Sequence, residues 1–190
     1  MALPWGSNSS LPLEALAGGV RVDVVALAAS GASDPISSFR RLFRASALPL
    51  VDGSFSAPPG TGYEIEVKVD AAPTNGSVYV VRGSIDGHEI NEQIILRTGG
   101  RVAKFVGWLQ DPTGAKRTRF TFPARGEAVV TIGVFTATEL NQSGKSAKQH
   151  TPQPPANALG ETFSGPLVGN SAFTIGQPVG AGMIRLRASA

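Results

Sequence analysis

The chain has 190 residues, a formal net charge of +3 and no cysteine. The absence of cysteine excludes disulfides, thiolate catalysis and cysteine-ligated zinc sites. Charged residues make up only 16% of the chain, below the usual quarter, and a surface with so few charges is weakly protected against association. We therefore expect one domain, with or without arms, part of whose surface is covered by partner subunits.

Glycine and proline are frequent, with 23 and 14 residues respectively. This content is too low for a disordered chain but suits many short strands joined by tight turns. The N-terminal stretch lacks a basic region followed by an apolar core, so we expect no secretory signal. No run approaches the roughly 20 apolar residues that a membrane-spanning helix needs, so we expect no membrane span.

The chain begins with an apolar, glycine-bearing segment, residues 1–19, which we expect to be an extended arm. The next stretch, "VRVDVV", alternates apolar and polar residues with a period of two, the pattern of a strand with one polar face. "SSFRRLFRASAL" (residues 37–48) predicts the one short helix, because a serine can cap it and its apolar residues fall on one side. Residues 49–62 predict a long loop.

Further along, "YEIEVKV", "RFTF" and "MIRLR" also alternate, whereas "VYVV", "QIIL" and "VVTIGVF" are apolar on both faces. Strands of the second kind lie centrally in a sandwich or face another subunit. The Pro-rich residues 140–170 are an excursion long enough to be functional, disordered or bound to a neighbour. The patterns together predict strands at 20–28, 63–70, 77–85, 88–96, 101–109, 117–122, 128–137, 171–176 and 182–188.

These strands predict an all-β fold. The expected architecture is an antiparallel β-sandwich, jelly-roll-like, with extended arms and at most one short helix. An immunoglobulin-like sandwich stays open, because the pattern does not fix the order of the strands. The expected organisation is an N-terminal arm (1–19), a sandwich core (20–139), an extended arm or loop (140–170) and C-terminal strands that complete the sandwich (171–190).

The stretch "VYVVRGSIDGHEINEQIIL" raises the question of a chemical site, because acidic residues and a histidine gather around Asp86-Gly87. Asp-Gly is a strong signal for a two-residue hairpin, since a type I′ turn needs positive φ at both central positions. Ile85 and His88 would then pair beside the turn. A metal or acid–base site made of Asp86, His88 and Glu92 would depend on one histidine at an exposed turn, and metal sites generally need more ligands and buried supporting groups. We interpret the stretch as a structural hairpin and predict no catalytic residue, metal or cofactor.

Basic residues gather in two parts of the chain. Residues 97–125 contain seven of them against one acid, Asp111, and residues 39–44 ("FRRLFR") contain three more. Such patches can meet phosphate or an acidic protein face, although solvated strand faces carry the same charges. The candidate contacts to a partner or to nucleic acid are Arg40, Arg41, Arg44, Arg97, Arg101, Lys104, Lys116, Arg117, Arg119 and Arg125.

Aromatic residues stand beside some of these basic residues, in "KFVGWL" and "RFTF". This combination occurs in surfaces that stack the bases of nucleic acids. The spacing of Trp108, Phe120 and Phe122 within strands favours core packing instead.

The series of stretches "YEIEVKV … VYVVRGSIDGHEI … VAKFVGWL … RTRFTF … VVTIGVF", which ends with "GMIRLRA", resembles small β-sandwich modules of uncharacterised bacterial and large-virus proteins. In its length, lack of cysteine and long arms, the chain also resembles the single jelly-roll proteins of icosahedral capsids, over residues 20–188. The resemblance implies a non-enzymatic structural protein of the virion: a minor capsid, penton or decoration subunit. It would assemble with its own copies or with other virion proteins, with nucleic acid as an optional partner and no small-molecule substrate.

Two other classes of function stay open. A soluble, cytoplasmic binding module for carbohydrate or peptide would be a stable monomer with an exposed aromatic cluster around Trp108. An enzyme would have to depend on His88 and its acidic neighbours.

Overall fold

The computed structural model describes residues 20–27, 40–45, 53–74, 76–90, 92–140, 154–156, 158, 160–166 and 172–188. Within these ranges the fold is all-β, as the sequence predicts, and none of the described residues forms a helix. In particular, no helix with the length and apolarity needed to cross a membrane is found among them. The strands are β1 (Val20–Ala26), β2 (Arg40–Ala45), β3 (Gly53–Ala57), β4 (Gly62–Val69), β5 (Val78–Ile85), β6 (His88–Glu89), β7 (Ile94–Leu96), β8 (Val102–Phe105), β9 (Trp108–Leu109), β10 (Lys116–Thr118), β11 (Phe120–Thr121), β12 (Glu127–Glu139), β13 (Thr162–Ser164) and β14 (Phe173–Ala188).

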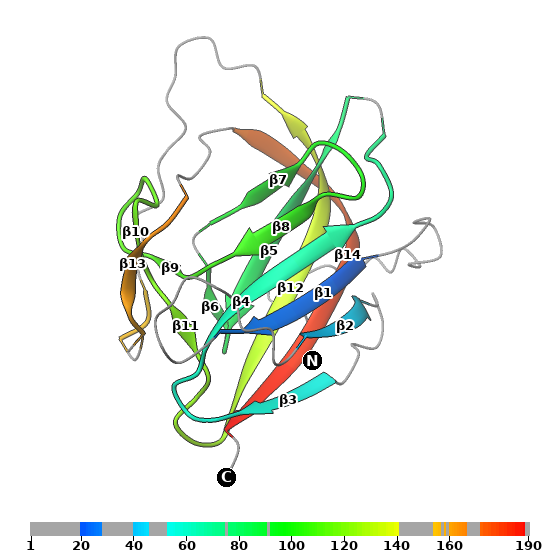
Figure 1. Ribbon diagram of the computed structural model, residues 1–190. Coiled ribbons are helices and arrows are strands. Elements are labelled where there is room, and N and C mark those ends of the chain that lie inside the picture. Colours follow the sequence, from blue (N-terminus) through cyan, green and yellow to red (C-terminus); the bar gives the residue numbers. More distant parts are fainter. Residues whose placement is uncertain are drawn as a thin grey trace.

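The strands form three sheets. Sheet A has the order β11-β4-β1-β2, with β8 also paired to β4. Sheet B has the order β3-β14-β12-β5-β6, with β7 also paired to β5, and sheet C has the order β13-β10-β9. Sheet A lies in front of the long strands β12 and β14 of sheet B, and sheet C lies at the left of the molecule (Figure 1). The described strand pairs are antiparallel except for β3 and β14, which run parallel.

Sheets A and B share one hydrophobic core, as expected for a β-sandwich. Ile65 and Val67 of β4 and Ile132 and Val134 of β12 are completely buried in it. Along β4 every second residue is buried, so the alternation predicted for "YEIEVKV" is confirmed. The repeat of two places alternate side chains on the core and on the solvent side of the sheet.

The predicted hairpin is confirmed. Asp86 and Gly87 have φ values of 52° and 78°, and Ile85 pairs with His88 beside the turn. Asp86 is the only non-glycine residue with positive φ in the described part of the chain. Aspartate tolerates the left-handed region better than most residues do, and glycine has no Cβ to clash there, so this dipeptide suits the turn.

The helix predicted over residues 37–48 is wrong for the part that the structure describes. Residues Arg40–Ala45 form strand β2, which pairs with β1 in an antiparallel ladder that runs from Val20 opposite Ala45 to Val25 opposite Arg40. A helix of about twelve residues is only marginally stable by itself. The edge of β1 offers a backbone partner to every residue of β2, and this long-range pairing overrides the local preference.

Two strands lie where the sequence predicts loop or arm. β3 falls inside residues 49–62 and pairs with residues Ile184–Ala188 of β14. β13 falls inside residues 140–170 and pairs with β10. Neither stretch has an apolar run or clear alternation, because each lies at the edge of its sheet. Residues 1–19, 141–153 and 167–171 lie outside the described residues.

Other predicted strands differ in continuity rather than in place. The strands predicted at 171–176 and 182–188 are one long strand, β14, whose pairing with β12 shifts register around Phe135. The strand predicted at 88–96 is divided into β6 and β7, and the strand predicted at 101–109 into β8 and β9. The strand predicted at 117–122 is divided into β10 and β11, which belong to different sheets.

Candidate interaction surface

The polar side chains of the β5–β6 hairpin have three separate partners. The Asp86 backbone N–H donates to the Val129 carbonyl, and Asp86 Oδ1 accepts a hydrogen bond from the Val129 N–H, both at 2.8 Å. The His88 ring meets the Trp108 ring edge-on, with 5.4 Å between centroids. Glu92 pairs with Arg117. Among the described residues, no three histidines or acidic residues come together in a way that could hold a metal ion.

Arg117 and Glu92 form a buried ion pair. Arg117 is completely buried, and its Nη1 and Nη2 atoms donate to the two carboxylate oxygens of Glu92 at 2.5 and 3.1 Å. Nη2 also donates to the Pro166 carbonyl at 2.7 Å, and Nε donates to the Gly114 carbonyl at 3.2 Å. The pair ties the segment after β6 to β10 and to the segment after β13. Its guanidinium is enclosed by the protein and is not part of the surface.

The other predicted basic contacts are spread over three sheets. Lys104 of sheet A lies between Glu64 and Glu66, at 3.5 and 3.2 Å from their carboxylates. Arg97, after β7 of sheet B, pairs with Glu139. The remaining positions are Lys116 on β10, Arg119 with its guanidinium 4.2 Å from the Phe163 ring centroid, exposed Arg101 and Arg125, and Arg40, Arg41 and Arg44 on β2. Their contact with a partner or nucleic acid stays a prediction.

The predicted core aromatics are confirmed as core. Trp108 is 6% exposed and packs edge-on against Phe120, with 5.2 Å between ring centroids. Tyr63 contacts both Phe120 and Phe122, at 5.5 and 5.4 Å. Burial, and next the negative charge of Asp86, raise the pKa of Tyr63 well above its usual range. The exposed aromatic cluster around Trp108 that a binding module would present is therefore not formed.

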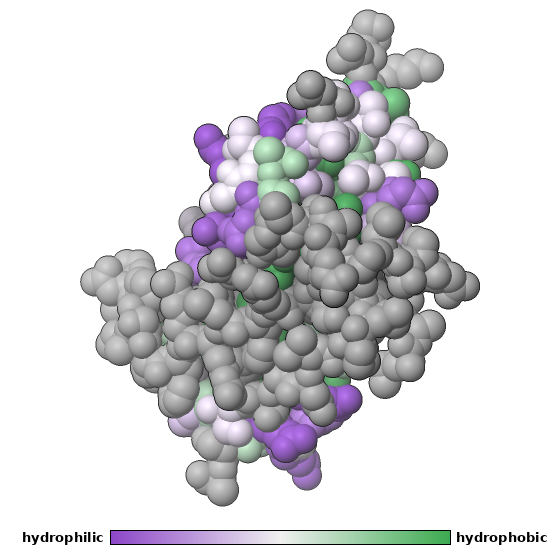
Figure 2. Space-filling view, turned by 90° about the vertical axis from the view of Figure 1, so that its right-hand side faces the viewer, coloured by the Kyte–Doolittle hydropathy of each residue, from purple (hydrophilic) through white to green (hydrophobic). Residues whose placement is uncertain are grey.

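The described surface exposes few large hydrophobic side chains. Val102 and Leu140, at 48% and 50%, are the only ones among the described residues. On the side seen in Figure 2, hydrophilic residues gather at the upper and lower ends of the described surface.

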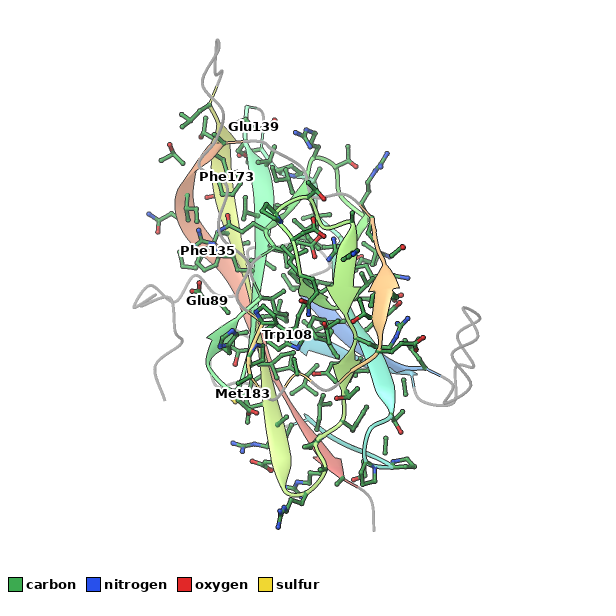
Figure 3. The ribbon with its side chains drawn as sticks, turned by 90° about the vertical axis from the view of Figure 1, so that its left-hand side faces the viewer. Glu89, Trp108, Phe135, Glu139, Phe173 and Met183 are labelled. Carbon is green, nitrogen blue, oxygen red and sulfur yellow. The ribbon has the colours of Figure 1, made fainter. Side chains whose placement is uncertain are left out.

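Sheet B carries a second apolar cluster on the face that points away from sheet A. Val78, Val80 and Ala137 are 7%, 0% and 2% exposed, and Ile95 and Phe173 pack against them. Phe135, which pairs with Val80, is 6% exposed on the same face. Figure 3 shows Phe135, Phe173 and Glu89 along this face of the sheet. The centre of this face, Val80 and Phe135, is nearly inaccessible to solvent, whereas Ile95 and Phe173 at its margin are half-buried.

Ion pairs lie at the two ends of this outer face. Arg97 and Glu139 pair near Phe173, which is opposite Glu139 in the ladder. At the other end, Glu127 accepts hydrogen bonds from Arg185 Nη1 at 2.5 Å and from Arg187 Nε at 3.2 Å. The hydrogen bond from Arg185, and then that from Arg187, lower the pKa of Glu127. An apolar centre with a charged rim is the usual anatomy of a protein–protein interface.

Two buried polar atoms on this face have no hydrogen-bond partner among the described residues. They are Arg82 Nε and Ser84 Oγ, from residues two apart on β5. The Arg82 guanidinium carbon lies 6.0 Å from the centre of the Phe135 ring. Burial lowers the pKa of Arg82, while the charge of Glu89 opposes the change. Because an unsatisfied buried polar atom costs about 1 to 3 kcal/mol, a group that hydrogen-bonds to both atoms would be favoured here.

The outer face was only half predicted by the sequence. "VYVV" and "VVTIGVF" are apolar on both faces, which indicates central strands or strands that face another subunit. Their pairing side by side, and the position of Arg82 and Ser84 beside Phe135, depend on long-range strand order. Comparison with family models, with curated proteins and with solved structures found no match.

Proposed function

We propose that this protein is a non-enzymatic structural subunit that assembles with other protein chains through the outer face of sheet B. Its setting would be a virus particle, where it would act as a minor capsid, penton or decoration subunit, in keeping with the sequence resemblance. The observation that supports the proposal is the second apolar cluster of sheet B, whose centre, Val80 and Phe135, is buried and whose margin, Ile95 and Phe173, is only half-buried.

Burial of apolar surface favours such an assembly. Apolar surface removed from water contributes roughly 25 cal/mol per Å², so a sheet that is apolar on both faces gains from a layer on each side. Sheet A supplies one layer. A partner would bury the half-exposed margin of the outer cluster, Ile95 and Phe173, and the ion pairs at both ends would form its rim. The low charge content of the chain leaves little repulsion to oppose such association.

The test is the oligomeric state of a variant with a charge in the centre of the face. Ile95→Glu places a carboxylate at a half-buried position against Val80. Val102→Glu is the matched control, because Val102 is an exposed apolar residue of sheet A. Light scattering after size-exclusion chromatography, over a range of concentrations, measures the dissociation constant of the assembly.

We expect the wild type and Val102→Glu to associate alike, and Ile95→Glu to raise the dissociation constant at least tenfold, equivalent to about 1.4 kcal/mol. Circular dichroism checks that each variant is folded. The proposal would be overturned if the wild type stays monomeric at every concentration and does not bind purified virus particles. That result would favour a monomeric binding module.

A further inference from the structure

We propose that copies of this protein exchange strand β13, so that β13 of one copy pairs with β10 of another. The exchanged part is residues 160–166, here called the β13 segment. Its binding site is the edge of β10 together with the buried Arg117 side chain. This site is separate from the outer face of sheet B, and the inference goes beyond the proposed function by naming a second copy of the chain as the partner.

The β13 segment is held in place mainly by backbone groups. β13 and β10 form a short ladder of three residue pairs. The ladder is continued by hydrogen bonds from the Arg119 N–H to the Glu161 carbonyl at 2.9 Å and from the Gly165 N–H to the Ala115 carbonyl at 3.1 Å. None of residues 160–166 is buried. A segment with so few buried contacts opens at a free energy well below that of global unfolding.

The ladder between β12 and β14 does not depend on this segment. The chain leaves β12 after Glu139 and returns at Phe173, and these two residues are opposite each other. The Leu140 N–H donates to the Ala172 carbonyl at 2.8 Å and closes the base of the excursion. Figure 1 shows β13 at the left of the molecule, away from the long strands. Exchange of such an element between identical chains is a low-cost route to association.

The site on β10 fits the sequence of the β13 segment. A Cβ added to Gly160 would lie 2.0 Å from the Arg119 carbonyl oxygen, and one added to Gly165 would lie 2.4 Å from Arg117 Nε, so both positions require glycine. Between the two glycines, the Phe163 ring centre lies 4.2 Å from the guanidinium carbon of Arg119, a cation–π contact. A strand that fits here therefore has an aromatic residue flanked by two glycines, and a second copy of the chain supplies that strand.

The site is incomplete without a bound strand. Arg117 Nη2 donates to the Pro166 carbonyl at 2.7 Å, so the segment provides one acceptor for a cation that is completely buried. Opening of the segment removes this acceptor and leaves the edge of β10 with unpaired backbone groups. Both losses favour the capture of a strand, either the original one or its equivalent from a second copy.

Concentration and reach set the balance between the closed and the exchanged form, because both forms make the same contacts at β10. A segment on a short flexible linker has an effective concentration at its own site in the millimolar range. Residues 167–171 connect Pro166 to Ala172 and reach at most about 20 Å. Two exchanging copies must therefore place sheet C of one beside the start of β14 of the other, and close packing of copies provides this proximity.

Disulfide trapping between two single-cysteine variants tests the exchange, because the chain has no cysteine of its own. One variant carries Lys116→Cys and the other Ser164→Cys, at exposed positions that are opposite each other in the ladder. The hydrogen bonds of Arg119 and Gly165 belong to the alternate pairs, so this pair is not hydrogen-bonded. In such a pair the Cα atoms are about 4.5 Å apart, within the range for a disulfide.

The matched control replaces Ser164→Cys by Thr162→Cys. Thr162 is exposed on the same segment, but it is opposite Thr118. It is therefore diagonal to Lys116, and Cα atoms about 7 to 8 Å apart are too distant for an unstrained disulfide. The two variants of each mixture are incubated together at roughly millimolar concentration. They are then oxidised mildly and analysed by non-reducing electrophoresis and intact mass.

We expect the mixture of Lys116→Cys and Ser164→Cys to form the mixed disulfide dimer at least tenfold faster than the control mixture. Equal rates, or the absence of mixed dimer, would overturn the inference. Ile95→Glu in both chains should leave the trapping rate unchanged, because Ile95 belongs to the outer cluster of sheet B. Failure of the proposed function and failure of this inference are therefore distinguishable.

The double variant Lys116→Cys/Ser164→Cys measures the opening step within one chain. Oxidation should lock β13 onto β10, and the reduced form of the same protein is the control. In the reduced form, amide hydrogen exchange should be much faster at Gly165 than at Ile132 of β12, which is paired on both sides. Oxidation should slow the exchange of Gly165 at least tenfold and leave that of Ile132 unchanged. An exchange rate at Gly165 that is the same in both forms would contradict separate opening.

Gly160→Ala tests the fit of the segment. Added to the Ser164→Cys chain, it should reduce the rate of mixed-dimer formation at least tenfold, because the methyl group meets the Arg119 carbonyl oxygen. Thr162→Ala, at an exposed position of the same segment, should leave the rate unchanged. Circular dichroism checks that both proteins are folded. Trapping that is equally fast with Gly160→Ala would show that β10 does not select this sequence and would count against a second copy as its partner.

Discussion

At the scale of single residues, the ion pair of Arg117 and Glu92 lies in the interior, where desolvation of the two charges is costly. Arg117 is completely buried, and every nitrogen of its guanidinium donates to a carboxylate or carbonyl oxygen. Such a pair contributes little net stability relative to well-packed apolar side chains, but removal of one partner leaves a buried charge without compensation. The pair therefore specifies how the segment after β6 meets β10 rather than adding to overall stability.

Arg117→Met is predicted to lower the free energy of unfolding by about 3 to 5 kcal/mol, because Glu92 loses its partner in the interior. The double variant Arg117→Met/Glu92→Leu should recover most of that loss. Urea unfolding followed by tryptophan fluorescence measures both values, and Arg101→Met, at an exposed position, should change stability by less than about 0.5 kcal/mol. If the double variant is as unstable as Arg117→Met, the pair contributes more to the free energy of unfolding than the mutual compensation of its two charges.

The pKa of Tyr63 predicts a loss of stability in alkali. Burial raises this pKa above its usual value of about 10. The folded protein therefore holds the phenol proton more tightly than the unfolded chain, so the stabilisation is complete below about pH 10 and is lost as the pH rises above it. Unfolding measured on both sides of about pH 10 should show a steeper loss for the wild type than for Tyr63→Phe. Parallel curves for the two proteins would contradict the prediction.

At the scale of elements, β12 and β14 form the longest ladder, and it is interrupted near its middle. The register shifts on both sides of Phe135, where β14 passes Gln177 and Pro178. The Thr136 hydroxyl accepts the Gln177 N–H at 2.9 Å and donates to the Gln177 carbonyl at 3.3 Å. A side-chain hydroxyl thus replaces the missing ladder partner. The irregularity lies next to the apolar cluster and helps to position Phe135.

Thr136→Val should destabilise the protein by about 0.5 to 1.5 kcal/mol, because the isosteric side chain removes the acceptor of the exposed Gln177 N–H and only water can replace it. Thr138→Val, at an exposed position of the same strand, is the control and should be close to neutral. Thermal unfolding compares the two, and amide hydrogen exchange of Gln177 should accelerate in the first variant only. Unchanged exchange at Gln177 would argue against the role of the hydroxyl.

At the scale of the whole molecule, the close approach of β1 to β14 sets the spacing of the two sheets. Gly180 of β14 faces Val20 of β1, and a Cβ at Gly180 would be only 2.8 Å from Val20 Cγ2. The absence of a side chain at Gly180 lets the two sheets approach closely at this point.

Gly180→Ala is expected to cost about 1 to 3 kcal/mol, because the added methyl group forces the sheets apart at Val20. Removing the obstacle with Val20→Ala in the same chain should relieve part of the strain, so the double variant should be more stable than the sum of the single effects. Denaturant unfolding of the four proteins measures this coupling. Strict additivity would mean that the two residues do not determine the spacing.

The sequence by itself determined the features that depend on neighbouring residues. Alternation with a period of two placed β1, β4 and the C-terminal part of β14, and runs that are apolar on both faces placed β5 and β12. Asp86-Gly87 specified a hairpin turn, because positive φ is a local demand on two residues. The aromatic residues at core spacing, Trp108 among them, were also predicted correctly.

The tertiary structure alone decided which strands pair and what lies on each face. It made Arg40–Ala45 a strand of sheet A instead of a helix, placed β3 beside the distant C-terminal residues and buried Arg117 against Glu92. It also brought β5 and β12 together, so that Val80, Phe135 and Arg82 share one outer face. Strand pairing joins residues far apart in the chain through backbone groups that every residue carries. The local side-chain pattern therefore does not determine which strands pair with each other.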